Sequence, residues 1–346
     1  MRSEVPGADP AVVGPYLARV LDEPGWRDCT VEVIAGGRSN LTYYVDSPAG
    51  SVVLRRPPLR AVRPTAHDMT REHRVLSGLA GTAVPVPRPV HLCTDPDVLG
   101  APFYLMERVD GVIARGSLPA GYAETAAERR AMTYGLVDVL AELHAVDPGG
   151  VGLADFGRPD GYLARQVRRW VGEWEALRDA DRPAVDALAA ALADRVPRAP
   201  SGPVVHGDYR LDNVVLDPAD PARVAAVLDW EMSTLGDPLA DVGLLLVYWR
   251  QGGADDRATV TPSVTGLPGF PTRAEVVARY AGRTGRDVSA LPWYVAFGYF
   301  KLAVVVAGIV ARQKAGAMAD NRDDGLARAI DPLAEGGRAA LGGADW

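Results

Sequence analysis

The sequence predicts an α+β protein with two lobes: a small N-terminal antiparallel β lobe with one internal helix, and a larger, mainly helical C-terminal lobe. At 346 residues the chain is longer than one hydrophobic core usually spans. Short apolar runs rich in β-branched residues precede Gly111, whereas apolar residues recur every three or four positions after it. We therefore divide the chain into lobes at residues 1–107 and 108–346.

The N-terminal lobe contains five expected elements. Asp9 followed by Pro10 is typical of a helix start, and the "SPAG" segment is typical of a hairpin turn. The elements are a helix over 9–22, a strand in 29–36, a hairpin over 42–56, a helix over 65–79 and a strand over 102–109.

The C-terminal lobe is expected to be helical over 128–146, 161–178 and 183–196, where apolar residues form stripes. Residues 250–272 are rich in Gly and Pro and form a long loop. The apolar run 293–313 is long enough to cross a membrane, but Lys301 interrupts it, which favours a buried helix.

Composition excludes several classes of protein. With 48% hydrophobic and 23% charged residues the chain is neither disordered nor fibrous. A net charge of −7 argues against a nucleic-acid partner. Cys29 and Cys93, the only cysteines, form no disulfide framework or zinc site, and the N-terminus does not resemble a secretory signal. We expect a cytoplasmic protein without a membrane or nucleic-acid partner.

The stretch "VVHGDYRLDNVVLDPADPARVAAVLDW", residues 204–230, places polar side chains beside two apolar β-runs. The Asp- and Pro-rich turn between the runs predicts a hairpin. Asn213 and Asp229 then meet at its open end, and Asp208 arrives there on the preceding loop, with no lysine nearby. Carboxylate and amide oxygens suit Mg²⁺.

Asp208 and Asn213 have the spacing of the kinase catalytic loop, and Asp229 ends the next strand, as a metal-binding aspartate does. "HGDYRLDNVV" followed by "VLDWEMSTLGDPLAD" resembles the aminoglycoside phosphotransferase/choline-kinase-like family of small-molecule kinases. Within it, the chain looks most like the branch related to the kinase domains of acyl-CoA dehydrogenase family members ten and eleven.

This resemblance implies a protein-kinase-like fold and a role for each motif residue. Asp208 is the catalytic base, Arg210 faces the transferred phosphate, and Asn213 and Asp229 hold the Mg²⁺ ion. Three further residues are interpreted as structural: His206 braces the catalytic loop, Asp241 anchors it, and Asp237 caps a helix.

The N-terminal lobe offers candidates for nucleotide binding. The segment "AGGRSNLTYYV" contains a turn whose backbone N–H groups could cradle phosphates, through Gly37, Ser39 and Asn40. Around Glu107 and Val109 the strand predicted over 102–109 resembles the hinge whose backbone binds adenine.

A strand arginine and a helix acid complete the kinase pattern. Arg55 and Arg56 point to opposite faces of their strand, and Arg55 is the better candidate for the phosphates, although kinases use lysine there. Glu72 falls on an apolar helix stripe and needs a cation, for which Arg55 is suitable.

The resemblance makes ATP the expected donor, with GTP as an alternative. A small-molecule hydroxyl is the expected acceptor, a hydroxyacyl compound or another hydroxylated metabolite by likeness to the branch. Basic residues for an anionic acceptor are available at Arg165, Arg168, Arg169, Arg312 and Lys314, whereas Glu231 could serve a polycationic one. The alternatives are an aminoglycoside or macrolide phosphotransferase, a pseudokinase that binds nucleotide without turnover, and a protein kinase. The sequence does not set the oligomeric state.

Overall fold

The computed structural model describes residues 5–34, 40–59, 67–178, 181–198, 202–251, 262–314 and 324–343. The chain forms two compact units. Unit 1 comprises Met1–Asp110 and Ala225–Ser233, and unit 2 comprises Gly111–Val224 and Thr234–Trp346. The first boundary between the units lies after Asp110, and the division into lobes at residues 1–107 and 108–346 stays a prediction.

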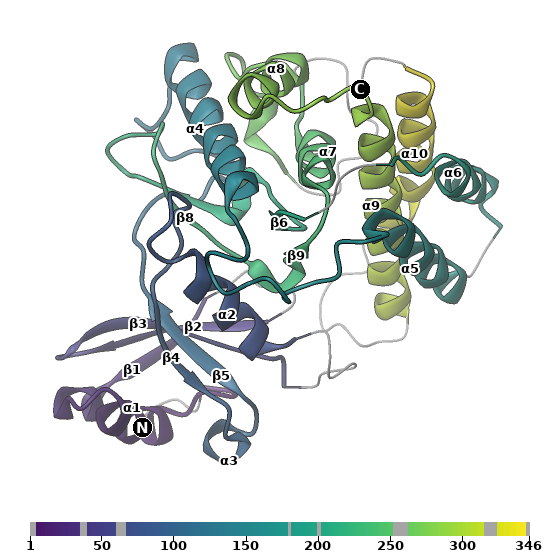
Figure 1. The fold of residues 1–346 in the computed structure, drawn as a ribbon. Helices are drawn as coiled ribbons and strands as arrows, with labels where there is room; N and C mark the ends of the chain where they lie inside the picture. Colours follow the sequence, from purple (N-terminus) through teal and green to yellow (C-terminus); the bar gives the residue numbers. More distant parts are fainter. Residues whose placement is uncertain are drawn as a thin grey trace. The chain divides into compact units, whose positions relative to one another are not determined.

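Unit 1 is built on a five-stranded antiparallel sheet with the strand order β1-β2-β3-β5-β4 (Figure 1). The predicted hairpin is present, because β2 pairs with β3 and Ser47 lies opposite Gly50. The strands are β1 (Thr30–Val33), β2 (Leu41–Ser47), β3 (Gly50–Arg56), β4 (Pro89–Cys93) and β5 (Phe103–Glu107).

Helix α1 (Pro10–Val20) packs against this sheet and begins as predicted, with Asp9 accepting a hydrogen bond from the N–H of Ala11. Helix α2 (Met69–Leu79) begins after Asp68, which caps it; residues 65 and 66 of the predicted helix lie outside the described residues. The short helices η1 (Pro24–Asp28) and α3 (Pro96–Leu99) complete this part of unit 1. The sequence prediction missed β4, which begins at a proline on the edge of the sheet.

Unit 2 is mainly helical. The predicted stripes of α4 and α5 are buried, including Leu136 and Leu140 on α4 and Val167 and Trp174 on α5. Its long helices are α4 (Ala126–Ala145), α5 (Tyr162–Leu177), α6 (Pro183–Asp194), α7 (Pro238–Tyr248), α8 (Arg273–Thr284), α9 (Leu291–Lys314) and α10 (Asp324–Leu341).

Short strands frame the loops that carry the motif residues. Strand β6 (Val204–Val205) pairs with β9 (Thr234–Leu235), and β7 (Val214–Leu216) pairs with β8 (Val224–Val227), which is the predicted hairpin. Single 3₁₀ turns lie at η3 (Leu211–Asn213), η4 (Trp230–Met232) and η5 (Val264–Gly266). Within the loop predicted over 250–272, residues 252–261 lie outside the described residues.

Helix α9 is the central helix of unit 2, where it packs against α5, α6, α7 and α10 (Figure 1). In the described part of the chain it is the one helix long and apolar enough to cross a membrane, but 72% of its most apolar window is buried. A Cβ on Gly243 of α7 would lie 2.6 Å from the backbone of Tyr294 on α9. This close approach is typical of helices that form a protein core.

Candidate active site

The loop between β6 and β7, which carries Asp208, is held by a buried carboxylate from α7. Both oxygens of Asp241 accept backbone hydrogen bonds, at 2.7 Å from the N–H of His206 and 2.7 Å from that of Gly207. The side chain of His144 on α4 lies 3.2 Å from the same carboxylate. Asp241 therefore has the position of a loop anchor, as the sequence suggested.

Burial alone would raise the pKa of Asp241. The hydrogen bond and charge of His144, the charge of His206 and the His206 backbone N–H outweigh it, so the pKa is lowered from its usual 3.8. A carboxyl whose pKa is lower in the folded state stabilises the fold above the unfolded pKa, and this contribution is lost as the pH falls through the folded pKa.

Asp241→Asn should lower the free energy of unfolding by about 3 kcal/mol at neutral pH, because it breaks a buried charged network. Below about pH 4, the free energy of unfolding of the variant should also fall less steeply with pH than that of the wild type. Urea unfolding at several pH values tests both effects, with Asp181→Asn, an exposed carboxylate, as the control. Equal stability of Asp241→Asn and wild type would contradict the anchoring role.

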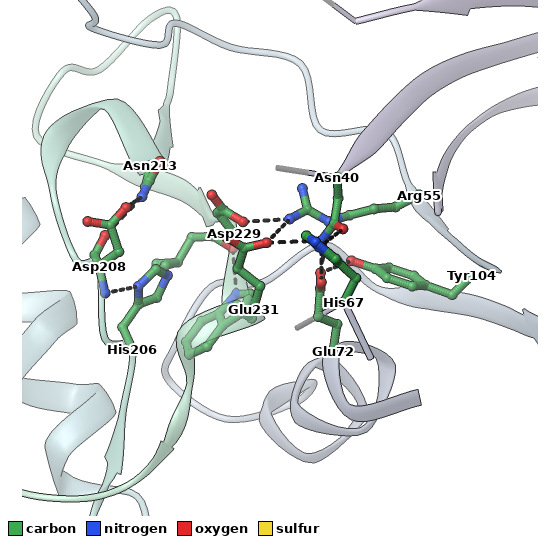
Figure 2. A network of polar contacts seen from close by, with 12 residues as sticks. Asn40, Arg55, His67, Glu72, Tyr104, His206, Asp208, Asn213, Asp229 and Glu231 are labelled. Carbon is green, nitrogen blue, oxygen red and sulfur yellow. Dashed lines mark hydrogen bonds and ion pairs between the residues drawn. The ribbon is translucent and has the colours of Figure 1, made fainter. Parts of the chain in front are cut away.

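Asp208 lies in a local hydrogen-bond network within unit 2 (Figure 2). Its backbone N–H donates to Nδ1 of His206 at 3.2 Å, so His206 braces the loop. The amide nitrogen of Asn213 donates to the carboxylate and to the carbonyl of Asp208, each at 2.9 Å. Since the nitrogen of Asn213 faces Asp208, the amide oxygen is the atom that could bind a metal.

Two cations lie beside this loop. The Nε of Arg210 is 3.4 Å from the carboxylate of Asp208, and another guanidinium nitrogen is 2.8 Å from Asp212. The ammonium of Lys301 on α9 donates to the carbonyl of Gly207 at 3.2 Å. The expectation that no lysine is near Asp208 was therefore wrong, because α9 brings Lys301 back from far along the sequence.

Arg55 is the centre of a second network, which lies entirely in unit 1 (Figure 2). Its Nε is 2.8 Å from Glu72 on α2, and its terminal nitrogen is 2.5 Å from Asp229. Tyr104 donates to Glu72 at 3.0 Å. Burial lowers the pKa of Arg55, but the charges of Glu72, Tyr104, Asp229 and Glu231 reverse this effect and raise it. Glu72 thus has the buried cationic partner that the helix pattern required.

Arg56 points to the other face of β3. Its guanidinium donates to the backbone carbonyls of Gly7 and Leu99, the latter at 2.8 Å. These contacts hold the N-terminal segment of unit 1 against the sheet. Of the two strand arginines, Arg55 alone pairs with Glu72 and Asp229 in the structure, which favours it for the nucleotide role.

The side chain of Asn40 has three protein partners within unit 1. Asn40 is buried, and its amide nitrogen donates to Glu72 at 2.8 Å and to Glu231 at 3.0 Å. Its amide oxygen accepts from His67 at 2.8 Å. The side chain thus joins three protein groups, and a phosphate contact of the Asn40 backbone N–H stays a prediction. Gly37 and Ser39 of the predicted phosphate turn lie outside the described residues.

The sequence prediction missed three members of this network. His67, Tyr104 and Glu231 were not singled out as partners of Asn40 or Glu72. Tyr104 could have been found by register, because it lies opposite Arg55 in the pairing of β3 with β5. His67 and Glu231 reach the network from irregular backbone, which no periodic pattern indicates.

Asp229 adopts an uncommon backbone conformation, with φ of 66° and ψ of 63°. Left-handed backbone is rare outside glycine, and Asp is one of the residues that tolerates it. Asp229 lies two residues after the end of β8 and directly before the turn η4, and from there its side chain reaches Arg55. A strained residue of this kind is a common feature of functional sites.

The sequence matches the phosphotransferase enzyme family over residues 30–294. The chain belongs to this family. It is therefore a member of a family of phosphotransferase enzymes.

Two curated relatives of this phosphotransferase are acyl-CoA dehydrogenase family member 10 of Mus musculus and member 11 of Gallus gallus. The first is 36% identical over 81% of the chain and the second 34% over 93%. The chain spans only 26% and 42% of their respective lengths.

A solved structure supports the fold of the phosphotransferase. A Ralstonia eutropha protein provisionally named an aminoglycoside phosphotransferase is 35% identical, with a TM-score of 0.77. The match covers 92% of this chain and 94% of that one. The predicted small-molecule kinase family and two-lobed kinase-like fold are confirmed.

The predicted hinge of the phosphotransferase lies at the end of β5. The N–H of Glu107 donates to the carbonyl of Arg88 at 2.8 Å, so this donor already has a partner within unit 1. An adenine contact at Glu107 would therefore use its carbonyl, and Val109 lies two residues further along the loop. Adenine binding at these two residues stays a prediction.

The metal site of the phosphotransferase also stays a prediction. Within the described ranges, no three His, Cys, Asp or Glu side chains form a cluster suited to a metal ion. The predicted ligands are instead an amide oxygen of Asn213 and a carboxylate of Asp229, which suit Mg²⁺ when phosphate oxygens complete its shell. Asn213 belongs to unit 2 and Asp229 to unit 1.

Proposed function

We propose that this phosphotransferase transfers the γ-phosphate of ATP to the hydroxyl of a small metabolite, with Mg²⁺ as cofactor. The observation that carries the proposal is the arrangement of Asp208, whose carboxylate is oriented by Asn213 on a loop anchored by Asp241. A carboxylate held in this way can accept the proton of a hydroxyl as it attacks phosphorus.

The remaining residues have complementary roles. Arg210 lies beside Asp208 and supplies positive charge for the transferred phosphate. Arg55, fixed by Glu72, would hold phosphate oxygens of the nucleotide. Asn213 and Asp229 would hold the Mg²⁺, which neutralises charge on the phosphates when bound. Glu107 and Val109 would recognise the base through backbone atoms, so GTP is an alternative donor to ATP.

For the acceptor, we propose a hydroxyacyl compound or a similar hydroxylated metabolite. The sequence similarity to acyl-CoA dehydrogenase family members supports an acyl acceptor. Glu231 is the acid considered for a polycationic drug. Its carboxylate already accepts a hydrogen bond from Asn40 and lies 3.9 Å from the guanidinium of Arg55. These contacts argue against Glu231 as a binding site for an aminoglycoside.

The experiment that tests the function is ADP release by the purified protein with hydroxyacyl-CoAs, aminoglycosides, macrolides, choline and sugars as acceptors. A strong response to one class identifies the acceptor. A response to drugs alone, with reduced drug susceptibility of cells that express the protein, would establish the antibiotic alternative. ATP binding without ADP release would indicate a pseudokinase, and phosphate incorporation into proteins of a cell extract would indicate a protein kinase.

Turnover should depend on Mg²⁺. We expect ADP release to fall to background when EDTA removes the divalent metal and to return when excess Mg²⁺ is added, because the phosphates need a cation for in-line transfer. The same titration with Asp229→Asn should need more Mg²⁺ for half-maximal rate. Full activity in EDTA would contradict the proposed cofactor.

A further inference from the structure

One buried tryptophan of unit 2 has an indole N–H without an acceptor in the described part of the chain. Trp170 on α5 is 9% exposed, and among the described residues nothing accepts a hydrogen bond from its Nε1. The other buried indoles with a described bond each donate to a fixed protein oxygen: Trp174 to Asp186, Trp230 to Val227, Trp249 to Pro271 and Trp293 to Leu192.

An unpaired buried donor is costly, and natural proteins keep few of them. One turn further along α5, the indole N–H of Trp174 donates to a carboxylate oxygen of Asp186 at 2.9 Å. An indole on this helix can therefore have a protein acceptor. The exception at Trp170 is therefore a reason to look for a ligand that supplies the acceptor.

Two cations flank the same indole. The ammonium of Lys301 lies 5.5 Å from the ring centroid of Trp170, and the guanidinium of Arg169 lies 5.8 Å from it. Cations over an indole face are attracted to its π-electrons. The indole N–H and the two cations thus bring hydrogen-bond donors and positive charge to this part of unit 2.

Lys301 connects this indole to the catalytic loop. It lies in the middle of α9, and it donates to the carbonyl of Gly207, the residue directly before Asp208. Burial lowers the pKa of Lys301, while the charges of Asp208 and Asp241 oppose the shift and that of Arg169 adds to it. A largely buried ammonium is costly unless hydrogen bonds and opposite charges replace the water that it loses.

We propose that the Trp170 N–H and the Lys301 ammonium bind an acyl oxygen of the phosphoryl acceptor, close to the hydroxyl that reacts at Asp208. The inference rests on the proposed function and names the acceptor class further: a hydroxylated acyl compound, with either a thioester carbonyl or a free carboxylate. Both groups present an oxygen that accepts hydrogen bonds, whereas a polycationic amine does not fit two cations.

The test uses ligands without a hydroxyl, so that binding is separated from turnover. Butyryl-CoA provides a thioester oxygen and butyrate a carboxylate. Their binding is measured by calorimetry with wild type, Trp170→Phe and Trp174→Phe. The Phe at position 170 keeps the aromatic ring for Lys301 and removes only the N–H.

We expect Trp170→Phe to weaken binding of the preferred ligand about five- to tenfold, as for the loss of one hydrogen bond. Trp174→Phe removes an indole N–H that already bonds to Asp186, so it should bind the ligand as wild type does. ATP affinity should be unchanged in both variants. Thermal unfolding of the two variants checks that each is folded.

Lys301→Met tests the second donor and separates the two ligands. Loss of the ammonium should weaken the binding of butyrate more than that of butyryl-CoA, because the ammonium forms a stronger hydrogen bond with a charged carboxylate than with a neutral thioester oxygen. With a hydroxylated acyl acceptor, Trp170→Phe should raise the acceptor KM about five- to tenfold and leave the ATP KM unchanged. A purely structural role of Trp170 would not raise the acceptor KM while leaving the ATP KM unchanged.

Two results would overturn the inference: wild type binding neither acyl ligand, or Trp170→Phe binding them as tightly as wild type. The proposed function fails separately, when no acceptor gives Asp208-dependent ADP release. Acyl ligand binding that depends on Trp170, in a protein without such release, would support the subsite and refute the kinase proposal.

Discussion

Replacing Asp208 with Asn should lower the turnover number by a factor on the order of 10²–10⁴, as expected for the loss of a general base. The Asn side chain cannot take the proton of the acceptor hydroxyl. Its amide oxygen can still accept from Asn213, and its backbone N–H can still donate to His206. The loop should therefore keep its conformation, and ATP affinity should change little.

The measurement is steady-state ADP release with the best acceptor, together with ATP binding by calorimetry. Asp220→Asn is a suitable control, because Asp220 caps the turn of the β7–β8 hairpin and has no proposed catalytic role. Turnover close to that of the wild type in Asp208→Asn would remove Asp208 from the mechanism, whatever the acceptor.

Arg55→Ala should weaken ATP binding about 10- to 100-fold, as for the loss of a charged hydrogen bond. The same change leaves the buried Glu72 without its cation, so we expect a loss of about 3–5 kcal/mol in the free energy of unfolding. Arg55→Lys should recover part of the ATP affinity, because it restores the charge without the fork of donors.

Arg56→Ala is the matched control for this prediction. It removes hydrogen bonds to the carbonyls of Gly7 and Leu99 and should lower stability without weakening ATP binding. ATP titrations are made well below the unfolding temperature of each variant, so that the two effects stay separate. The opposite order, with Arg56→Ala losing more ATP affinity, would show that the other strand arginine holds the phosphates.

Local features of the fold could be predicted from the sequence because their signals are local. Asp9 and Pro10 indicated the start of α1, and the "SPAG" turn indicated the hairpin of β2 and β3. Glu72 was predicted to need a cation because an acid on an apolar helix stripe is rarely unpaired. Its salt bridge with Arg55 follows from that reasoning.

Contacts between distant segments could not be predicted in the same way. Asn40 bonds to Glu231 across 191 positions, and Lys301 reaches Gly207 across 94. No periodicity or turn signal encodes such pairs, because they depend on how elements pack. The same is true of residues 225–233, which lie between the two segments of unit 2 in the sequence but belong with unit 1.

That interrupted course of unit 1 has a consequence for the newly made protein. Arg55 and Asp229 are separated by 174 positions, so the ribosome must add all the residues between them before the ion pair can form. At about 5–20 residues per second, synthesis of this stretch takes roughly 10–35 seconds. During that interval the nascent sheet of unit 1 carries Arg55 and Glu72 without their third partner. The N-terminal unit can therefore be completed only after most of the polypeptide has been translated.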